Sequence, residues 1–388
     1  MTLAFDPASD PFSTVEFENF LTDVKARRAE IEALRHVPAD IMARMKAVGI
    51  YRAIVAKEFG GWEVSLKTFL RMLERLSAAD GSTGWVASFG GTTYLAALPR
   101  HRIAELYKNG PDVAFAGGLH PAQPAKKVPG GLQIKGRWNF ASGCMGADLI
   151  GVGVTVEGDP VTGSGAPIPR LVVLKPEQVK IVDNWNVVGL CGTGSHDVVV
   201  DDVVVSEEWS FVRGQAASTL PQPIFRFPMV ARAALFHSTV GMGIARAALD
   251  EFVASATDKR SITGAPPPID RAYVQRGFAI EEARLRSARA FLYEQVDAAW
   301  KVVSGGGAVD VAGTNLLRLA AINAAEVAAR VTQEVCKLAG TGSAGLSNPL
   351  QRFMRDAHVV NLHAFLGERH LESAGRIMFG MKPLAGYP

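Results

Sequence analysis

The sequence predicts an α+β protein in three parts: a helical N-terminal region, a central β region and a C-terminal helical bundle. The chain has 388 residues, more than one simple core usually contains. Apolar residues recur at helical spacing in the first and last thirds. Between them, short β-branched runs alternate with turns, and no helical pattern separates them.

The N-terminal region is expected to be helical over residues 1–110. Stretches such as VEFENFLTDVKARRAEIEALRHV and EVSLKTFLRMLERLSAADG keep apolar residues on one helical face and charges on the other. Pro38 marks the start of a further helix, which stops at Gly49. The apolar, small-residue stretch STGWVASFGGTTYLAAL predicts a tightly buried helix.

The central region, residues 111–220, is expected to form an antiparallel β-barrel. Its runs, among them DLIGVGVTV, RLVVLKP and SHDVVVDDVVV, are short and closely spaced. Gly130-Gly131 and GDPVTGSGAPIP read as connections between strands. A parallel α/β sheet would require helices between the strands, and none is indicated.

The C-terminal region, residues 221–388, is expected to form a four-helix bundle. Four long amphipathic stretches follow one another, and GAPPPID and SGGGAVD break the run. The last of the four begins NPLQRFMRDAHVVNLHAF and is read as one helix.

Composition narrows the function classes. Hydrophobic residues make up 48% and charged residues 20% of the chain, which is typical of a globular protein. A net charge of +3 argues against a nucleic-acid partner, and no apolar run approaches the ~18 residues of a membrane span. Cys144, Cys191 and Cys336 lie far apart, so no disulfide framework is expected and a cytoplasmic location is predicted.

Two motifs match known ligand-binding patterns, but their sequence context argues against binding of a dinucleotide or a metal. GTGSAG, starting at Gly340, matches a dinucleotide-binding pattern but follows a helix rather than a strand, so a loop is favoured. On one helix, His358 and His363 would point about 140° apart, and His363 and His370 would lie two turns apart. No metal site is therefore expected, and His363 is either a core histidine or a single acid–base group.

Two further stretches admit both a structural and a ligand-binding interpretation. GRWNFASGC, residues 136–144, is explained by a strand and its turn, or by a flat aromatic platform with a serine beside it. NWNVVGLCGTGSHDVVVDD, residues 184–202, is explained by a plain β-connection, or by a small-residue loop that lets a ligand approach backbone N–H groups.

Taken together, DGSTGWV, GRWNFASGC, WNVVGLCGTGSHDVVVDDVVV and NPLQRFMRDAHVVNLH resemble motifs of the acyl-CoA dehydrogenase superfamily across essentially the whole chain. The resemblance implies that fold: N-terminal helices, central β-barrel and four-helix bundle. In the dehydrogenases a glutamate removes the substrate α-proton. The two positions known for it correspond here to Ala364 and Ala231, which weakens a desaturase function.

The pattern RDxHxxxxH together with FASG instead resembles the two-component flavin-dependent monooxygenases, which include aromatic hydroxylases and sulfur oxygenases. That resemblance implies a reduced flavin, FADH2 or FMNH2, delivered by a separate NAD(P)H-dependent reductase. The flavin would react with O2 and form a C4a-(hydro)peroxyflavin. This species would transfer one oxygen atom to a small aromatic or heteroaromatic substrate. It also implies a homotetramer.

The resemblance assigns roles residue by residue. His363, Ser142 and His120 are the catalytic candidates, His363 as acid–base group and Ser142 as hydrogen-bond partner of flavin N5. The candidates for holding the flavin are Trp138, Asn139, Phe140, Ala141, Ser142, Gly192, Thr193, Ser195 and Arg260. The candidates for the substrate pocket are Trp85, Phe89 and Phe365.

Two rival functions remain open from sequence. One is an acyl-CoA dehydrogenase-type flavoenzyme whose base has moved, and the other is a flavin-binding homologue without catalysis. Arg355 and Asp356 are expected to form a structural or flavin-edge pair, and His358 to be a packing residue.

Overall fold

The computed structural model describes residues 10–89, 92–162, 165–214, 218–256, 266–384 and 387. The chain forms two compact units. The first, called the β unit, comprises Met1–Phe69, Trp85–Asn186 and Cys191–Met229. The second, called the bundle unit, comprises Leu70–Gly84, Val187–Leu190 and Val230–Pro388. The N-terminal helices thus belong mostly with the sheet, and the threefold division by residue range stays a prediction.

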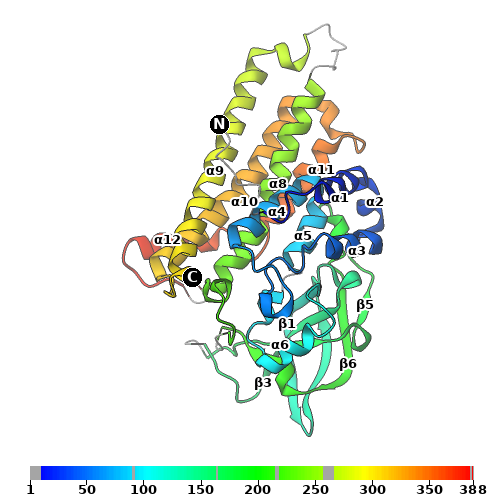
Figure 1. Ribbon diagram of the computed structural model, residues 1–388. Helices are drawn as coiled ribbons and strands as arrows, with labels where there is room; N and C mark the ends of the chain where they lie inside the picture. The colour runs from blue at the N-terminus through cyan, green and yellow to red at the C-terminus, as the bar shows by residue number, and fades with distance from the viewer. Residues whose placement is uncertain are drawn as a thin grey trace. The chain divides into compact units, whose positions relative to one another are not determined.

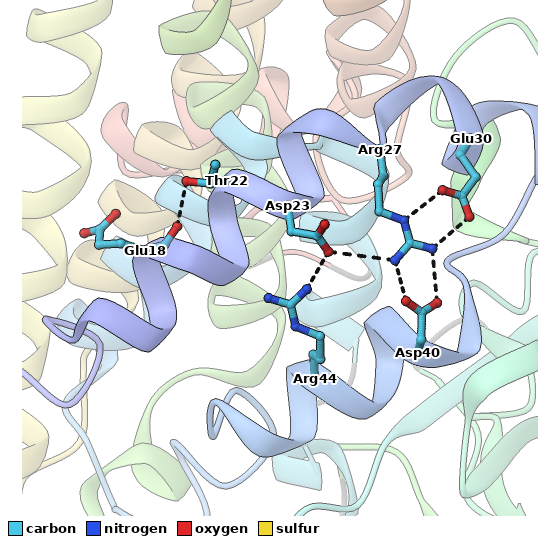
Figure 2. A network of polar contacts seen from close by, with 7 residues as sticks. All are labelled: Glu18, Thr22, Asp23, Arg27, Glu30, Asp40 and Arg44. Atoms are coloured by element: carbon cyan, nitrogen blue, oxygen red, sulfur yellow. Dashed lines mark hydrogen bonds and ion pairs between the residues drawn. The ribbon is translucent and has the colours of Figure 1, made fainter.

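The β unit begins with three short helices, α1 (Val15–Ala26), α2 (Arg28–Leu34) and α3 (Ala39–Ala47). Thr14 caps α1, because its hydroxyl accepts the amide of Phe17 at 3.1 Å. Arg27, at the junction of α1 and α2, donates to Glu30 and to Asp40, as Figure 2 shows. These ion pairs are exposed, so they orient α3 against its neighbours more than they stabilise it.

Figure 2 shows a second link between the same helices, in which Arg44 of α3 donates to Asp23 of α1 at 2.5 Å. Further along, α6 (Arg100–Leu106) and α7 (Pro223–Arg226) belong to the β unit. Most of α4 (Leu66–Ala79) belongs to the bundle unit, and α5 (Gly81–Phe89) is divided between the two units. Short 3₁₀ turns occupy Lys57–Phe59, Thr92–Leu95, Cys144–Gly146, Pro176–Gln178, Cys191–Thr193, Glu207–Trp209, Pro268–Asp270 and Thr341–Ala344.

Seven strands form the sheet of the β unit, in the order β5-β6-β2-β1-β3-β4-β7. They are β1 (Phe115–Val128), β2 (Gly131–Trp138), β3 (Leu149–Val156), β4 (Arg170–Leu174), β5 (Lys180–Val182), β6 (Asp197–Val205) and β7 (Ser210–Val212). The expectation of a wholly antiparallel arrangement is wrong at one pair, since β1 and β3 run parallel. The chain leaves β2, passes β1 and adds β3 on the far side, which makes β3 parallel to β1.

The bundle unit contains α8 (Met229–Ala256), α9 (Ala272–Ser304), α10 (Val311–Ala339), α11 (Pro349–Asn361) and α12 (Arg369–Met378). Figure 1 shows α9 and α10 running side by side, and α8 packs against α10 at Gly241 and Ala328. The segment read from sequence as one fourth helix is two helices, because the chain leaves helical geometry after α11 and resumes it at α12. This break contains His363.

Helix α8 is buried along most of its length and packs unusually closely. A Cβ atom at Gly241 would lie 3.3 Å from both Ala328 Cβ of α10 and Val360 Cγ1 of α11. A Cβ at Gly243 would lie 2.3 Å from the carbonyl oxygen of Glu74 on α4. Glycine at position 243 therefore allows the backbones of α8 and α4 to approach, whereas at position 241 the neighbouring side chains would have to shift by only a few tenths of an ångström.

No helix in the described part of the chain is long and apolar enough to span a membrane.

Candidate active site

Four side chains of the β unit form a buried hydrogen-bond chain. The indole Nε1 of Trp85 donates to Ser142 Oγ at 3.1 Å. Ser142 Oγ lies 2.6 Å from Ser195 Oγ, which in turn lies 2.7 Å from Thr193 Oγ1. We call these residues the hydroxyl cluster. From sequence, Ser142, Thr193 and Ser195 are all candidates for binding the same ligand, and the structure brings the three side chains together.

The hydroxyl cluster gives Ser142 two possible hydrogen-bonding roles. If Ser195 donates to Ser142, both acceptor positions of Ser142 are filled and its own hydrogen is left for an outside acceptor. If Ser142 donates to Ser195, one acceptor position is left for an outside donor. Rotation of the hydroxyl hydrogens therefore switches Ser142 between donor and acceptor without moving a heavy atom.

The turn that carries Ser142 is held by the loop that carries the other two hydroxyls. The amide of Ala141 donates to the carbonyl of His196 at 3.0 Å, and the amide of Gly143 to that of Thr193 at 2.8 Å. Gly143 has φ +76°, and a Cβ there would come within 2.9 Å of Val86. Glycine at position 143 is therefore required for this turn to pack against the loop that carries Thr193 and Ser195.

Phe140 is both exposed and strained. Its backbone has φ +63°, in the left-handed region that non-glycine residues rarely occupy. Its ring is 59% exposed and meets the ring of Trp185 edge-on at 6.2 Å. A strained backbone that holds an apolar ring in solvent is typical of a ligand-binding position. Trp185 was not predicted as a site residue.

The remaining sequence candidates of this region differ in what they present. Trp138 is fully buried, and its indole donates to the carbonyl of Gly153 at 2.6 Å. Its ring therefore belongs to the β core, which was the structural interpretation of this strand. Asn139 is partly buried, and Ala141 and Gly192 are buried, so Ala141 and Gly192 can offer a ligand mainly backbone groups.

His120 is exposed and joins the site only through its backbone, because its carbonyl accepts the amide of Asn139 at 2.8 Å. Phe89 is partly buried and lies 5.6 Å from Trp85, ring to ring. Arg260 lies outside the described residues.

The bundle unit holds a cluster of three rings. The rings of His237 on α8 and His363 lie 4.4 Å apart and are inclined by 60°. Phe365 contacts both: it lies 5.0 Å from His363, edge-on, and 6.1 Å from His237, nearly parallel. We call these residues the histidine cluster.

The two histidines are kept neutral by burial. Burial lowers the pKa of His363 to about 4, and burial together with the neighbouring His363 lowers the pKa of His237 well below its usual value. The amide of Phe365 donates to His363 Nδ1 at 3.3 Å. A neutral imidazole that accepts at Nδ1 carries its hydrogen on Nε2, so His363 presents a hydrogen-bond donor there.

Two expectations about the histidine region need correction. His363 lies after the end of α11, so the helical geometry used to relate it to His358 and His370 does not apply. His358 is exposed rather than packed. His370 Nε2 donates to the carbonyl of Ala364, 2.7 Å away, and thereby ties α12 to the break.

Asp356 has a structural setting. It is buried and accepts the amide of Leu190 at 2.6 Å, while Arg352 joins it to Asp80. Burial raises the pKa of Asp356 to about 6. Arg355 donates to Gln351 and to the carbonyl of Val188. The pair expected from sequence therefore fastens the short segment 187–190 to α11.

His237 is the residue that sequence reasoning missed in the bundle. A signal was present: a lone histidine in the apolar, small-residue stretch AALFHSTVGMG. It could not be separated from an ordinary core histidine, because its neighbour His363 is 126 positions away along the chain.

Comparison with known proteins places the chain in a family. Residues 16–102 match the family model described as acyl-CoA dehydrogenase, N-terminal domain, and residues 235–368 match the acyl-CoA dehydrogenase C-terminal domain. An indole-3-acetate monooxygenase of Pseudomonas putida is 49% identical over 384 residues, covering 98% of this chain and 97% of that protein.

A flavin-dependent monooxygenase, oxygenase subunit HsaA, of Rhodococcus jostii (strain RHA1) is 32% identical and covers 89% of this chain and 92% of its own length. The crystal structure of 3-HSA hydroxylase from Rhodococcus sp. RHA1 superposes with a TM-score of 0.85 at 26% identity. It covers 96% of this chain and 98% of that one. The chain therefore belongs to the acyl-CoA dehydrogenase family, and within it to the flavin-dependent monooxygenases.

Proposed function

We propose that this protein is the oxygenase component of a two-component monooxygenase, supplied with reduced flavin by a separate NAD(P)H-dependent reductase. The observation that carries the proposal is the hydroxyl cluster around Ser142. Ser142 lies in the same turn as Phe140, whose backbone is strained and whose side chain is exposed. Bound reduced flavin supplies the oxygen-activating chemistry. One oxygen atom goes to the substrate, the other leaves as water, and the flavin provides two electrons.

The hydroxyl cluster fits a flavin for a chemical reason. The flavin ring nitrogen N5 carries a hydrogen in the reduced state and none in the oxidised state. Ser142 can accept from the first form and donate to the second, because its partners Trp85 and Ser195 permit both orientations of its hydroxyl. Phe140 and Trp185 offer a flat apolar surface of the kind that a planar ring system contacts.

In this proposal His363 orients the substrate. Its Nε2–H donates a hydrogen bond to an oxygen or to the electron-rich edge of the substrate, and its low pKa keeps the imidazole uncharged at neutral pH. Removing a proton from the substrate would require the opposite tautomer, so donation is the primary role. Phe365, which lies beside His363, is the proposed apolar contact of the substrate in the histidine cluster. In the β unit, Trp85 acts through its indole N–H on Ser142.

For the substrate we propose a small aromatic compound, with indole-3-acetate as the first to test. The support is the 49% identical relative named for that substrate. FAD and FMN remain alternatives to be distinguished by binding. We also propose a cytoplasmic location, which the three free cysteines favour.

The dehydrogenase alternative lacks its base. The two positions at which the family carries a glutamate are Ala231, which is buried, and Ala364, which is exposed. The buried carboxyl closest to the break along the chain, Asp356, is engaged by the amide of Leu190 and by Arg352. We therefore propose no desaturase activity.

The test supplies the purified full-length protein with chemically reduced FAD or FMN, indole-3-acetate and ¹⁸O₂. We expect a product heavier by one labelled oxygen atom, formed only with reduced flavin and oxygen. As a control, glucose oxidase and catalase remove oxygen, which should abolish the product. Reduction of bound oxidised flavin by an acyl thioester without oxygen would instead support the dehydrogenase, and oxygen consumption without any product from a panel of indoles and phenols would contradict the proposal.

We also propose that the protein is a homotetramer, as is usual for this fold. The end of α12 and the segment after it expose the apolar side chains of Met378, Phe379, Met381 and Leu384, with Phe379 82% exposed. Several exposed apolar residues within one short segment are typical of a subunit interface.

A further inference from the structure

The contact between His237 and His363 follows from the way α8 and α11 pack. Gly241 allows α8 to approach Val360 of α11, where a Cβ would lie only 3.3 Å from the valine methyl. His237 lies one helical turn before Gly241, and His363 lies three residues after Val360. The close approach of the two helices thus brings the rings of the histidine cluster to 4.4 Å.

Phe365 closes the cluster on its other side. Its ring lies nearly parallel to that of His237, with 11° between the planes, and meets His363 edge-on. Its amide donates to His363 Nδ1. A rotation of the His363 ring about its side-chain bonds would break this hydrogen bond and displace both ring contacts, so the two neighbours restrict the ring together.

We propose that His237 is a positioning residue for His363: its ring holds the His363 imidazole against the Phe365 amide and so keeps the hydrogen of His363 on Nε2. The inference rests on the proposed function for the role of His363, but the positioning itself is a property of the bundle unit. His237 is not proposed to touch substrate or flavin.

Electrostatics agrees with this geometry. Each histidine is kept neutral by burial, and a charge on His363 further disfavours one on His237. Among the described residues of the helices packed around them, the buried charged side chains are Arg232 on α8, Arg318 on α10 and Arg352 with Asp356 on α11. Arg352 and Asp356 pair with each other, Arg352 also with Asp80, and Arg318 donates to the carbonyl of Val230. A neutral imidazole can accept the Phe365 amide at Nδ1, whereas a charged ring carries hydrogen on both nitrogens and could not.

The test uses the full-length protein without flavin, labelled with ¹³C and ¹⁵N in its histidine rings, so that the readout does not depend on activity. His363→Asn identifies the signals of His363. His237→Phe keeps an aromatic ring, His237→Ala removes it, and His237→Asn fills part of the space without a ring if the alanine variant does not fold. Leu235→Ala is the matched control, since Leu235 is equally buried on α8 but two residues away, on another face.

In the wild type and in His237→Phe, we expect His363 to show a single tautomer with hydrogen on Nε2 and a pKa below the usual histidine range. In His237→Ala and His237→Asn, we expect mixed tautomers and a higher pKa of His363, with Leu235→Ala like the wild type. With reduced flavin and substrate, kcat should fall about tenfold in the ring-less variants and the KM for flavin should stay unchanged.

Three results would overturn the inference. The first is an unchanged His363 signal in both ring-less variants, and the second is the same change in Leu235→Ala. The third is a His237→Phe protein that behaves like His237→Ala. The inference and the proposed function fail separately: a wild type with no oxygenated product but the expected NMR pattern contradicts only the proposed function, whereas product formation without the NMR pattern contradicts only the positioning.

Discussion

Individual residues of this protein owe their chemistry to neighbours that are distant in sequence. Ser142 can act as donor or acceptor toward a ligand, because Trp85 fills one of its acceptor positions and its hydrogen bond with Ser195 can run in either direction. His363 becomes a donor at Nε2 because the amide of Phe365 occupies Nδ1. In both cases a common residue type acquires a defined role from two contacts.

Replacing Ser142 by alanine tests the hydroxyl cluster. The change removes the switchable hydroxyl and leaves the Trp85 indole without its acceptor, so we expect about tenfold to a hundredfold less product, at about 1.4 kcal/mol per tenfold. Oxygen uptake should continue and yield hydrogen peroxide. The control is Ser88→Ala, since the Ser88 hydroxyl bonds the carbonyl of Trp85 within its own helix. Equal losses in both variants would contradict the role of Ser142.

Replacing Phe140 by glycine should raise or preserve the stability of the protein but weaken its binding of reduced flavin. Glycine at position 140 relieves a φ of +63° and should leave the protein equally stable or more stable, by up to about 1–2 kcal/mol in urea unfolding. The same variant should bind reduced flavin more weakly, because the exposed ring is lost. Asp202→Gly is the matched control: its φ of +60° is also relieved, and flavin binding should not change.

The neutrality of His363 predicts a pH dependence of stability. Its pKa in the folded protein, about 4, lies below that of an unfolded histidine, so the unfolded chain binds more protons between pH 4 and 6.5. Stability from this group is fully present above pH 6.5 and is lost as the pH falls. The slope is at most about 1.4 kcal/mol per pH unit, and solvent at the partly buried ring reduces it.

The measurement is urea unfolding of the wild type and of His363→Asn from pH 7 to pH 4.5. The difference between their free energies of unfolding should shrink toward acid pH. Asp356 acts in the opposite sense, because its raised pKa favours the folded state at lower pH, but it is present in both proteins and cancels. A constant difference would show that His363 is not held neutral.

At the scale of elements, the break after α11 is the feature that creates the histidine cluster. The sequence pattern predicts one amphipathic helix over residues 348–380, because the apolar spacing continues on both sides of the break. The structure ends α11 at Asn361 and starts α12 at Arg369. The cause is tertiary, since the turn is fixed by bonds of His363, Phe365 and His370 that helical periodicity does not contain.

Two glycines of α8 provide a graded test of helix packing. Alanine at Gly243 would place its Cβ 2.3 Å from the Glu74 carbonyl oxygen, a backbone atom that cannot step aside, so we expect a loss of about 2–3 kcal/mol. Alanine at Gly241 meets side chains at 3.3 Å and gains about 1 kcal/mol of helix propensity, so its effect should be near zero. Urea unfolding compares them, and equal effects would contradict the backbone contact.

At the scale of the whole molecule, assembly is expected to depend on the apolar C-terminal segment. Replacing Phe379 by lysine puts a charge on a side chain that is 82% exposed in the single chain, so the fold should persist and the tetramer should dissociate. Light scattering after gel filtration measures the mass. The exposed Val15→Lys is the control, and a tetramer that survives Phe379→Lys would place the interface elsewhere.

The sequence by itself determined the class of protein, most of its helical and β regions, and the motifs of its candidate site. Helical and alternating patterns are local, so they identified the helical regions and the β region, and the motifs around Ser142 and His363 identified the flavin-dependent monooxygenases. Only the tertiary structure decided the parallel pairing of β1 with β3, the burial of Trp138 in the core and the partnership of His237 with His363. Each of these depends on contacts between residues far apart in the chain, and a pattern that repeats every two or four residues carries no information about such contacts.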